Sequence, residues 1–327
     1  MLVLTRADVE ALLTMQETVE AVEDGFRRFA AGEVVMPQRL ATAVEPHDGI
    51  YLTMPCVVGG DPGAVAVKVV AVYGENPARF GLPAIQGLLL LYDPPTGRPL
   101  ALMDAEHVTA MRTGAVSGVA TKHLAREDAA VVTLFGAGPQ ARGQLEAVCA
   151  VRPIRRCLLV TRTGAHDAEF AREMGAKLGI EIAPERDVRA AVEAADVICT
   201  ATNSEQPLFA GTWLRPGVHI NSVGSFTAKM CELDPETVRR SRVFVDSHTA
   251  AQTEAGEIVQ AIAAGAIAYS HVAGDLGSLL QGDVPGRTRA DEITLFKSVG
   301  LGLQDAVTAA RVYAQAVAKG AGQSVAL

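Results

Sequence analysis

The sequence lacks several features that define common protein classes. Its 327 residues contain no dense apolar run longer than residues 87–92, far short of the roughly 18 residues that span a bilayer. The first charge comes at Arg6, too early for the apolar segment of a signal peptide. Basic residues are outnumbered 29 to 37, a net charge of −8, and form no stripe that would bind nucleic acid or an anionic membrane. We therefore expect neither membrane insertion, nor secretion, nor a nucleic-acid partner.

Motifs for metal binding, disulfide bonding and hydrolysis are also missing. The five cysteines are scattered and never form C-x-x-C, which favours reduced thiols and a cytoplasmic protein. Seven histidines show neither H-E-x-x-H nor a ligand cluster, so no metal is expected. The nearest match to a G-x-S-x-G turn, at residues 114–118, has its serine one position too late.

The chain is long enough for two domains of about 150 residues each. Apolar residues make up 49% of it, enough to form the cores of both domains. Thr5 and Asp8 form a capping box that predicts a helix start. Apolar residues within 19–29 recur at helical spacing. Residues 64–72 are mostly β-branched and predict a buried strand. Strands at 86–91 and 100–103 are expected to form a hairpin, and a helix is expected at 104–123.

From Asp128 onward the pattern alternates strand and helix, which predicts a parallel, doubly wound α/β sheet of the Rossmann type at residues 128–300. The predicted strands are 129–135, 157–161, 180–183, 197–200, 218–223 and 243–245. The predicted helices are 140–150, 167–178 and 188–195. Residues 290–318 are expected to form one long helix, interrupted near Ser298-Val-Gly300 and returning to the first domain. That domain would then be discontinuous, at 1–127 and 301–327.

A glycine turn follows the first strand of the alternating region and opens a helix, the context required of a dinucleotide-binding fingerprint. Gly136 permits the tight turn, Gly138 lets the backbone approach a pyrophosphate, and Ala141 allows close helix–strand packing. The helix N-terminus favours the anion. The predicted turn residues are Gly136, Ala137, Gly138, Pro139 and Gln140.

The end of the second strand indicates which cofactor is used. NAD enzymes usually place an acid there, whereas this chain has Thr161, Arg162 and Thr163, and no acid before Asp167. A guanidinium can pair with a 2′-phosphate, which favours NADP(H). NAD(H) stays open, because Arg162 could also be an ordinary surface arginine.

Three basic residues stand in apolar or small-residue surroundings, namely Arg39, Lys68 and Arg112. A charge inside a buried strand is costly without a partner or a pKa shift, so Lys68 indicates function. The alternative is that Lys68 extends to an edge of the sheet.

Over essentially its whole length the chain resembles the ornithine cyclodeaminase/mu-crystallin family. The matching segments are Pro37-Gln-Arg39, Val67-Lys-Val69, Met111-Arg-Thr-Gly-Ala115, Gly136-Ala-Gly-Pro-Gln140, His219-Ile-Asn-Ser-Val-Gly224 and Phe296-Lys-Ser-Val-Gly300. The resemblance implies that Arg39 and Arg112 hold a substrate carboxylate and that Lys68 is the acid/base group near the reacting nitrogen. It also implies an α+β substrate-binding domain through which two copies dimerise. Further predicted cofactor contacts are Arg112, Thr113, Thr200, Ala201, Thr202, Val223 and Ser298.

Members of this family catalyse several reactions. Cyclodeaminases carry an aspartate in the loop after the strand at 219–224, where this sequence has Phe226, and no carboxylate follows before Glu232. The pattern therefore resembles the ketimine-reductase branch, which implies NAD(P)H-dependent reduction of pyrroline-2-carboxylate or piperideine-2-carboxylate to proline or pipecolate. Ornithine cyclodeaminase, alanine dehydrogenase and a non-catalytic crystallin-like binding protein remain the alternatives.

Overall fold

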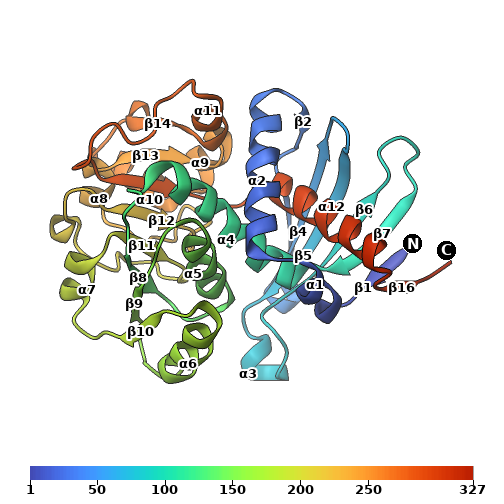
Figure 1. Cartoon of the computed structure of the whole chain (residues 1–327), viewed down its shortest axis with the longest axis horizontal. Coiled ribbons are helices and arrows are strands. Elements are labelled where there is room, and N and C mark those ends of the chain that lie inside the picture. The colour runs from blue at the N-terminus through green and yellow to red at the C-terminus, as the bar shows by residue number, and fades with distance from the viewer. Residues whose placement is uncertain (327) are drawn as a thin grey trace. The chain divides into compact units, whose positions relative to one another are not determined.

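The computed structural model describes residues 1–326, which fold as two compact units (Figure 1). One unit comprises Met1–Arg112 and the chain from Leu301 onward, and the other comprises Thr113–Gly300. Helix α4 (Ala105–Leu124) therefore crosses the boundary, which the sequence analysis placed at residue 127. Its C-terminal half belongs with the second unit, where Thr121 accepts a hydrogen bond from Asn221. In the described part of the chain no helix is both long and apolar enough to cross a membrane.

The first unit is built on a mixed sheet in the order β16-β1-β7-β6-β5-β4-β2, with β3 paired to β4. Its strands are β1 (Leu2–Leu4), β2 (Val34–Val35), β3 (Leu40–Val44), β4 (Gly49–Val58), β5 (Ala64–Tyr73), β6 (Ile85–Tyr92), β7 (Pro99–Asp104) and β16 (Gln323–Ser324). Its helices, besides the first part of α4, are α1 (Arg6–Leu12), α2 (Met15–Ala30), α3 (Asn76–Phe80) and α12 (Gly302–Lys319).

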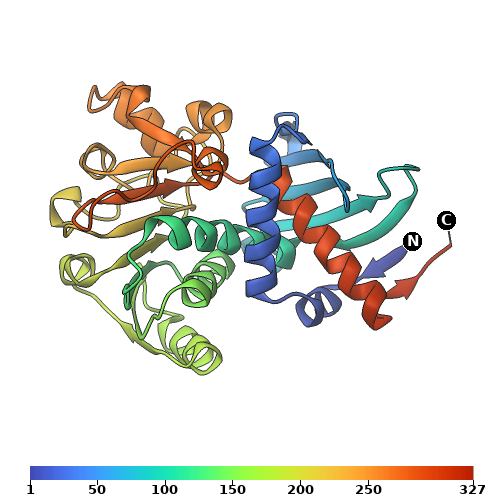
Figure 2. The ribbon, with the colours of Figure 1, turned by 45° about the horizontal axis from the view of Figure 1, so that its top comes forward.

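One face of this sheet is covered by α2 and α12, which pack against each other and are seen in Figure 2 in blue and red. The capping box of Thr5 and Asp8 is confirmed at the start of α1. Alternation along β5 buries Ala64, Ala66, Lys68 and Val70, because successive side chains of a strand point to opposite faces. The face that carries Lys68 is therefore the one that α12 covers.

The second unit is the predicted doubly wound parallel sheet, in the order β10-β9-β8-β11-β12-β15-β13-β14, and every recorded pairing in it is parallel. Its strands are β8 (Val131–Phe135), β9 (Arg156–Val160), β10 (Glu181–Pro184), β11 (Val197–Thr200), β12 (His219–Ser222), β13 (Arg242–Val245), β14 (Val272–Asp275) and β15 (Thr294–Lys297). Its helices are α5 (Pro139–Val151), α6 (Asp167–Leu178), α7 (Val188–Ala194), α8 (Pro235–Arg240), α9 (His248–Glu254), α10 (Gly256–Ala263) and α11 (Leu276–Gln281).

The prediction of one interrupted helix over 290–318 is wrong in its first part. Thr294–Lys297 is strand β15, which pairs on both edges with β12 and β13 and is buried throughout. A strand buried on both faces shows no alternation of polar and apolar residues, so periodicity could not separate it from a helix. The helix begins only at Gly302.

Candidate functional site

Apart from Arg112 and Thr113, which lie on α4, the residues predicted to bind the cofactor lie along one edge of the parallel sheet. Parallel strands all end at the same edge, so the turns after β8, β9, β11, β12 and β15 gather there. This edge carries the glycine turn after β8, the Thr161–Thr163 segment after β9 and the Thr200–Thr202 segment at the end of β11. Val223 follows β12, and Ser298 follows β15.

The glycine turn has the geometry that a pyrophosphate needs. Gly136 has φ +108°, and a Cβ there would lie 2.7 Å from the carbonyl oxygen of Ala201, so a side chain would be strained and crowded. Gly138 caps α5 with extended backbone, and a Cβ there would meet nothing within 4 Å. Pro139 takes the first helical position, where its missing N–H costs nothing. The open approach and the free N–H groups of the first turn therefore fit a dinucleotide.

An acid from the next helix lies beside the end of β9, although the sequence shows no acid there before Asp167. The first turn of α6 brings Asp167, which is 3% exposed, to within hydrogen-bond distance of Thr161, which donates to Oδ1. The other oxygen, Oδ2, pairs with Arg186 at 2.7 Å. Arg186 also donates to the carbonyl of Thr161. Both carboxylate oxygens are thus engaged inside the protein, while Arg162 is exposed at the same turn.

A second carboxylate, missed in the sequence analysis, fixes the turns after β11 and β12. Glu232 is fully buried and accepts from the hydroxyl of Thr200, the amide of Thr202 and the amide of Gly224, at 2.7, 2.7 and 2.8 Å. A third carboxylate does the same after β15: Oδ2 of Asp246 accepts from the hydroxyl of Ser298 and from the amide of Gly300. Buried acids therefore hold the backbone of the edge.

The first unit holds a different kind of cluster, formed by charged side chains. Lys68 is 2% exposed, so it does not extend to an edge of the sheet. Its Nζ lies 2.7 Å from Oδ2 of Asp305 on α12 and 3.5 Å from the hydroxyl of Thr109 on α4. The other oxygen of Asp305 lies 3.0 Å from Nε of Arg112. One carboxylate thus bridges the two predicted functional side chains.

Arg112 is 6% exposed and is held from two sides. Besides its contact with Asp305, its Nη1 donates to Oε1 of Gln304. Arg112 belongs to the first unit, whereas Thr113, the next residue, belongs to the second and accepts a hydrogen bond from Gln144 through its carbonyl.

The pKa of Lys68 is lowered to about 8, mainly because burial leaves the charged ammonium poorly solvated and also because of the nearby cation Arg112. Asp305 raises this pKa, and the charge of Arg39 has a smaller lowering effect. A lysine with a pKa near neutrality can donate and accept protons at physiological pH.

Sequence reasoning identified the basic residues of this cluster and missed Gln304 and Asp305. A signal for Asp305 was available: it shares the apolar stripe of α12 with Ala309, Val312 and Ala316, at spacings of four, three and four residues. A carboxylate on a buried helix face needs a cation, and Lys68 is a buried cation.

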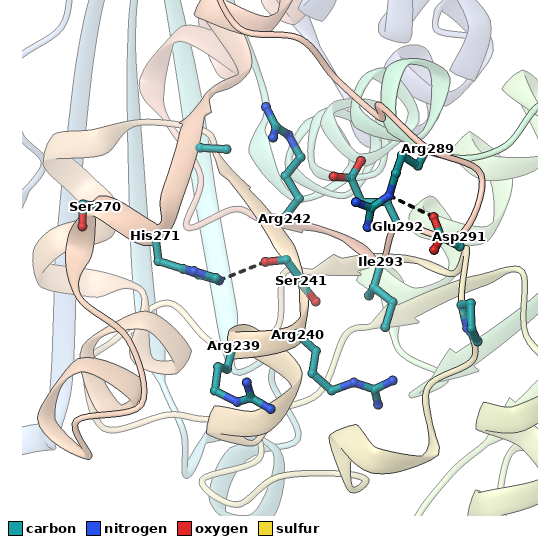
Figure 3. Close-up of a pocket in the computed structure, with 12 residues that line it drawn as sticks. Arg239, Arg240, Ser241, Arg242, Ser270, His271, Arg289, Asp291, Glu292 and Ile293 are labelled. Atoms are coloured by element: carbon teal, nitrogen blue, oxygen red, sulfur yellow. Dashed lines mark hydrogen bonds and ion pairs between the residues drawn. The ribbon is translucent and has the colours of Figure 1, made fainter.

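A separate hollow of about 670 Å³ in the second unit lies at the opposite edge of the sheet, where strands begin (Figure 3). It contains several arginines that already have partners within the protein. Arg289 pairs with Asp291, Arg240 donates to the carbonyl of Leu214, and Arg242 donates to the carbonyl of Pro285. These contacts within the protein give the three arginines a structural role.

Comparisons with known proteins are consistent with this geometry. The family model described as "Ornithine cyclodeaminase/mu-crystallin family" matches residues 1–320. The chain is 37% identical over 326 residues to Delta(1)-pyrroline-2-carboxylate reductase of Bacillus cereus (strain ZK / E33L), covering 99% of each. It is 36% identical over 330 residues to alanine dehydrogenase of Archaeoglobus fulgidus, covering 99% of this chain and 98% of that one. The structure of Thermococcus litoralis Delta(1)-pyrroline-2-carboxylate reductase in complex with NADH and L-proline is similar with a TM-score of 0.95 at 45% identity, covering 99% of this chain and 100% of that one.

Proposed function

Since the chain belongs to the ornithine cyclodeaminase/mu-crystallin family, we propose that it is an NAD(P)H-dependent oxidoreductase that reduces the C=N bond of cyclic 2-carboxy imines. Pyrroline-2-carboxylate, with proline as the product, is the first candidate substrate, because similar proteins act on it. Piperideine-2-carboxylate is the second. The observation that carries the proposal is the buried Lys68, held beside Arg112 by Asp305.

The residues divide the chemistry between them. When bound, the dihydronicotinamide supplies the hydride. Arg39 and Arg112 hold the substrate carboxylate, and this positioning of the adjacent C=N carbon lowers the barrier. Lys68 keeps the ring nitrogen protonated, directly or through a water, so that the carbon accepts hydride readily. Backbone N–H groups at Gly138 and the start of α5 hold the pyrophosphate.

The loop after β12 favours reduction over ammonia release. Phe226 is 38% exposed and has no group that could activate water or hold an ammonium ion. Glu232, the next acid along the chain, cannot replace an aspartate at that place, because four hydrogen bonds from Thr200, Thr202 and Gly224 occupy its carboxylate. Alanine dehydrogenase activity shares the same clamp and cofactor, and pyruvate with ammonia is the substrate pair that separates it.

We also propose that two copies pair through the outer face of the first unit's sheet, as the family resemblance implies. This face is opposite to the one that α2 and α12 cover. It exposes large apolar side chains that a monomer of this chain leaves to solvent: Leu40, Tyr51, Val57 and Leu88, at 64%, 45%, 42% and 54%. Apolar patches of this kind mark protein interfaces.

Lys68→Met is the principal test of the proposal. The substitution keeps length and burial but removes the acid, so imine reduction should fall by roughly 10²–10⁴-fold. NADPH binding, followed by fluorescence, should stay nearly unchanged. In the unsubstituted protein, kcat for reduction should fall as pH rises through about 8, because the lysine acts in its protonated form. Lys319→Met, at the exposed end of α12, is the control. Near-normal reduction by Lys68→Met would overturn the mechanism.

The carboxylate clamp can be tested with paired substrates. Arg39→Ala or Arg112→Ala should raise KM for the imino acid, since losing one partner of a buried charge pair costs about 2–5 kcal/mol. With a cyclic imine that lacks the carboxylate, the same variants should behave like the unsubstituted protein. An unsubstituted protein that turns over both substrates equally well would show that no clamp exists.

Cofactor preference depends on Arg162. We propose that NADP(H) is favoured, because this exposed arginine and the neighbouring Arg186 lie where a 2′-phosphate would bind, although the similar Thermococcus protein was solved with NADH. Arg162→Ala should weaken NADPH binding far more than NADH binding. Arg189→Ala, which removes an exposed arginine on α7, serves as the control. Equal loss for both cofactors would remove the argument.

The pairing of two copies predicts a mass of about twice 34.2 kDa in light scattering. Leu88→Lys introduces a charge in the middle of the exposed apolar face, so it should shift the protein toward the monomer. Val317→Lys, at a 57% exposed apolar position on α12, should leave the mass unchanged. A dimer that tolerates Leu88→Lys would place the interface elsewhere.

A further inference from the structure

Asp305 has a role that no sequence motif assigned to it. Its two oxygens are divided between two cations: Oδ2 contacts Nζ of Lys68 at 2.7 Å, and Oδ1 contacts Nε of Arg112 at 3.0 Å. The carboxylate is 1% exposed. We propose that Asp305 is the positioning residue of the reaction, which keeps Lys68 charged and aimed while it fixes Arg112 for the substrate carboxylate. This inference rests on the proposed function.

The charges around Lys68 make a compensating carboxylate necessary. Arg112 approaches from α4, and Arg39, from the segment before β3, adds a third positive charge to its electrostatic surroundings. On the neighbouring strands, Met54 and Leu89 pair with Lys68 and bring no charge. The pKa of the Cys56 thiol on β4 is raised to about 12, so it too stays neutral. Asp305 on α12 is the acid that contacts both Lys68 and Arg112.

The two cations depend on Asp305 to different degrees. Arg112 has a second holder, because Gln304 accepts from its Nη1. Lys68 has only the hydroxyl of Thr109 besides Asp305 among its recorded partners in the described residues, and a hydroxyl carries no charge. Removing the charge of Asp305 should therefore disturb the protonation of Lys68 more than the position of Arg112.

Lys68 and Arg112 carry two positive charges against the single carboxylate of Asp305, so these three side chains together carry a net positive charge. An incoming substrate carboxylate supplies a further negative charge, so it is attracted to a site that Asp305 only partly neutralises. A second acid in the cluster would remove this attraction, and the absence of any acid would deprotonate Lys68 before substrate arrives. One bridging carboxylate satisfies both requirements.

Asp305→Asn is the first variant to measure, because asparagine keeps the shape and removes the charge. The pH at which kcat/KM for imine reduction begins to fall should move down by one unit or more, which is a tenfold or greater change in the acid–base equilibrium. Gln304→Met should instead raise KM and leave that pH unchanged, since Gln304 contacts Arg112 and not Lys68. NADPH binding and thermal unfolding report whether each variant is folded.

Two further variants keep the inference open to refutation. In the Lys68→Met background, Asp305→Asn should cause no further loss of kcat, because the lysine through which Asp305 affects proton transfer is already gone. The effect that Asp305 has through Arg112 should appear in KM instead. Asp305→Glu keeps the charge but lengthens the side chain. The pH at which kcat/KM begins to fall should therefore stay the same, while kcat falls. If Asp305→Asn does not fold, Asp305→Glu decides the matter: an unchanged kcat overturns the positioning role.

The outcomes separate this inference from the proposed function. Near-normal reduction by Lys68→Met would reject the mechanism itself. If Lys68→Met is inactive but a folded Asp305→Asn variant shows no change in the pH at which kcat/KM begins to fall, only the role of Asp305 is rejected. An additional loss of kcat in the double variant would show that Asp305 acts independently of Lys68, which also contradicts the inference.

Discussion

Three elements of the first unit meet at one buried carboxylate, Asp305, which contacts two cations. Strand β5, helix α4 and helix α12 are far apart in the sequence, and each contributes a charged side chain to the contacts around Asp305. Taking these charges out of water is expensive, and replacing a buried ion pair by apolar residues is often neutral or stabilising, by about 1–4 kcal/mol. A gain in stability is therefore a weak explanation for the cluster. The proposed reaction offers a stronger one, because it requires a charged lysine held next to a fixed arginine.

The second unit uses buried carboxylates for a different purpose. Glu232 and Asp246 each accept several hydrogen bonds, and most of the donors are backbone amides or hydroxyls of the turns that follow β11, β12 and β15. These acids set the shape of the edge where strands end: Glu232 accepts four hydrogen bonds from Thr200, Thr202 and Gly224, and Oδ2 of Asp246 accepts three from Ser298, Val299 and Gly300. Asp305 orients charged side chains, whereas the acids of the sheet edge orient backbone. The proposed catalytic cluster and the proposed cofactor site are thus both supported by buried carboxylates, in two different environments.

The sequence predictions that the structure confirms are those that rest on local patterns. The glycine turn, the capping box at Thr5 and the β-branched strand around Lys68 depend on neighbours within a few residues, so they are visible in the chain itself. What was missed depends on partners that are distant in the sequence. The sequence of strand β15 cannot be told from that of a helix unless its neighbours β12 and β13 are known. The importance of Asp305 depends on its contact with Lys68, which lies 237 positions away in the chain. Asp167 was dismissed for its distance from the strand end, yet a helix turn folds it back onto Thr161.

The choice between reduction and ammonia release follows from the same distinction between free and engaged acids. The loop after β12 holds one aromatic residue, Phe226, and its next acid, Glu232, is tied into the turn that it shapes. A cyclodeaminase needs a carboxylate that is available to the departing amine. A reductase needs only a protonated C=N nitrogen and a held carboxylate, and the cluster of Lys68, Arg112 and Asp305 provides groups for both. Because hydrogen bonds from Thr200, Thr202 and Gly224 engage the carboxylate of Glu232, this acid is not available to a departing amine, which supports the proposal that Lys68 handles the proton and that the reaction is reduction.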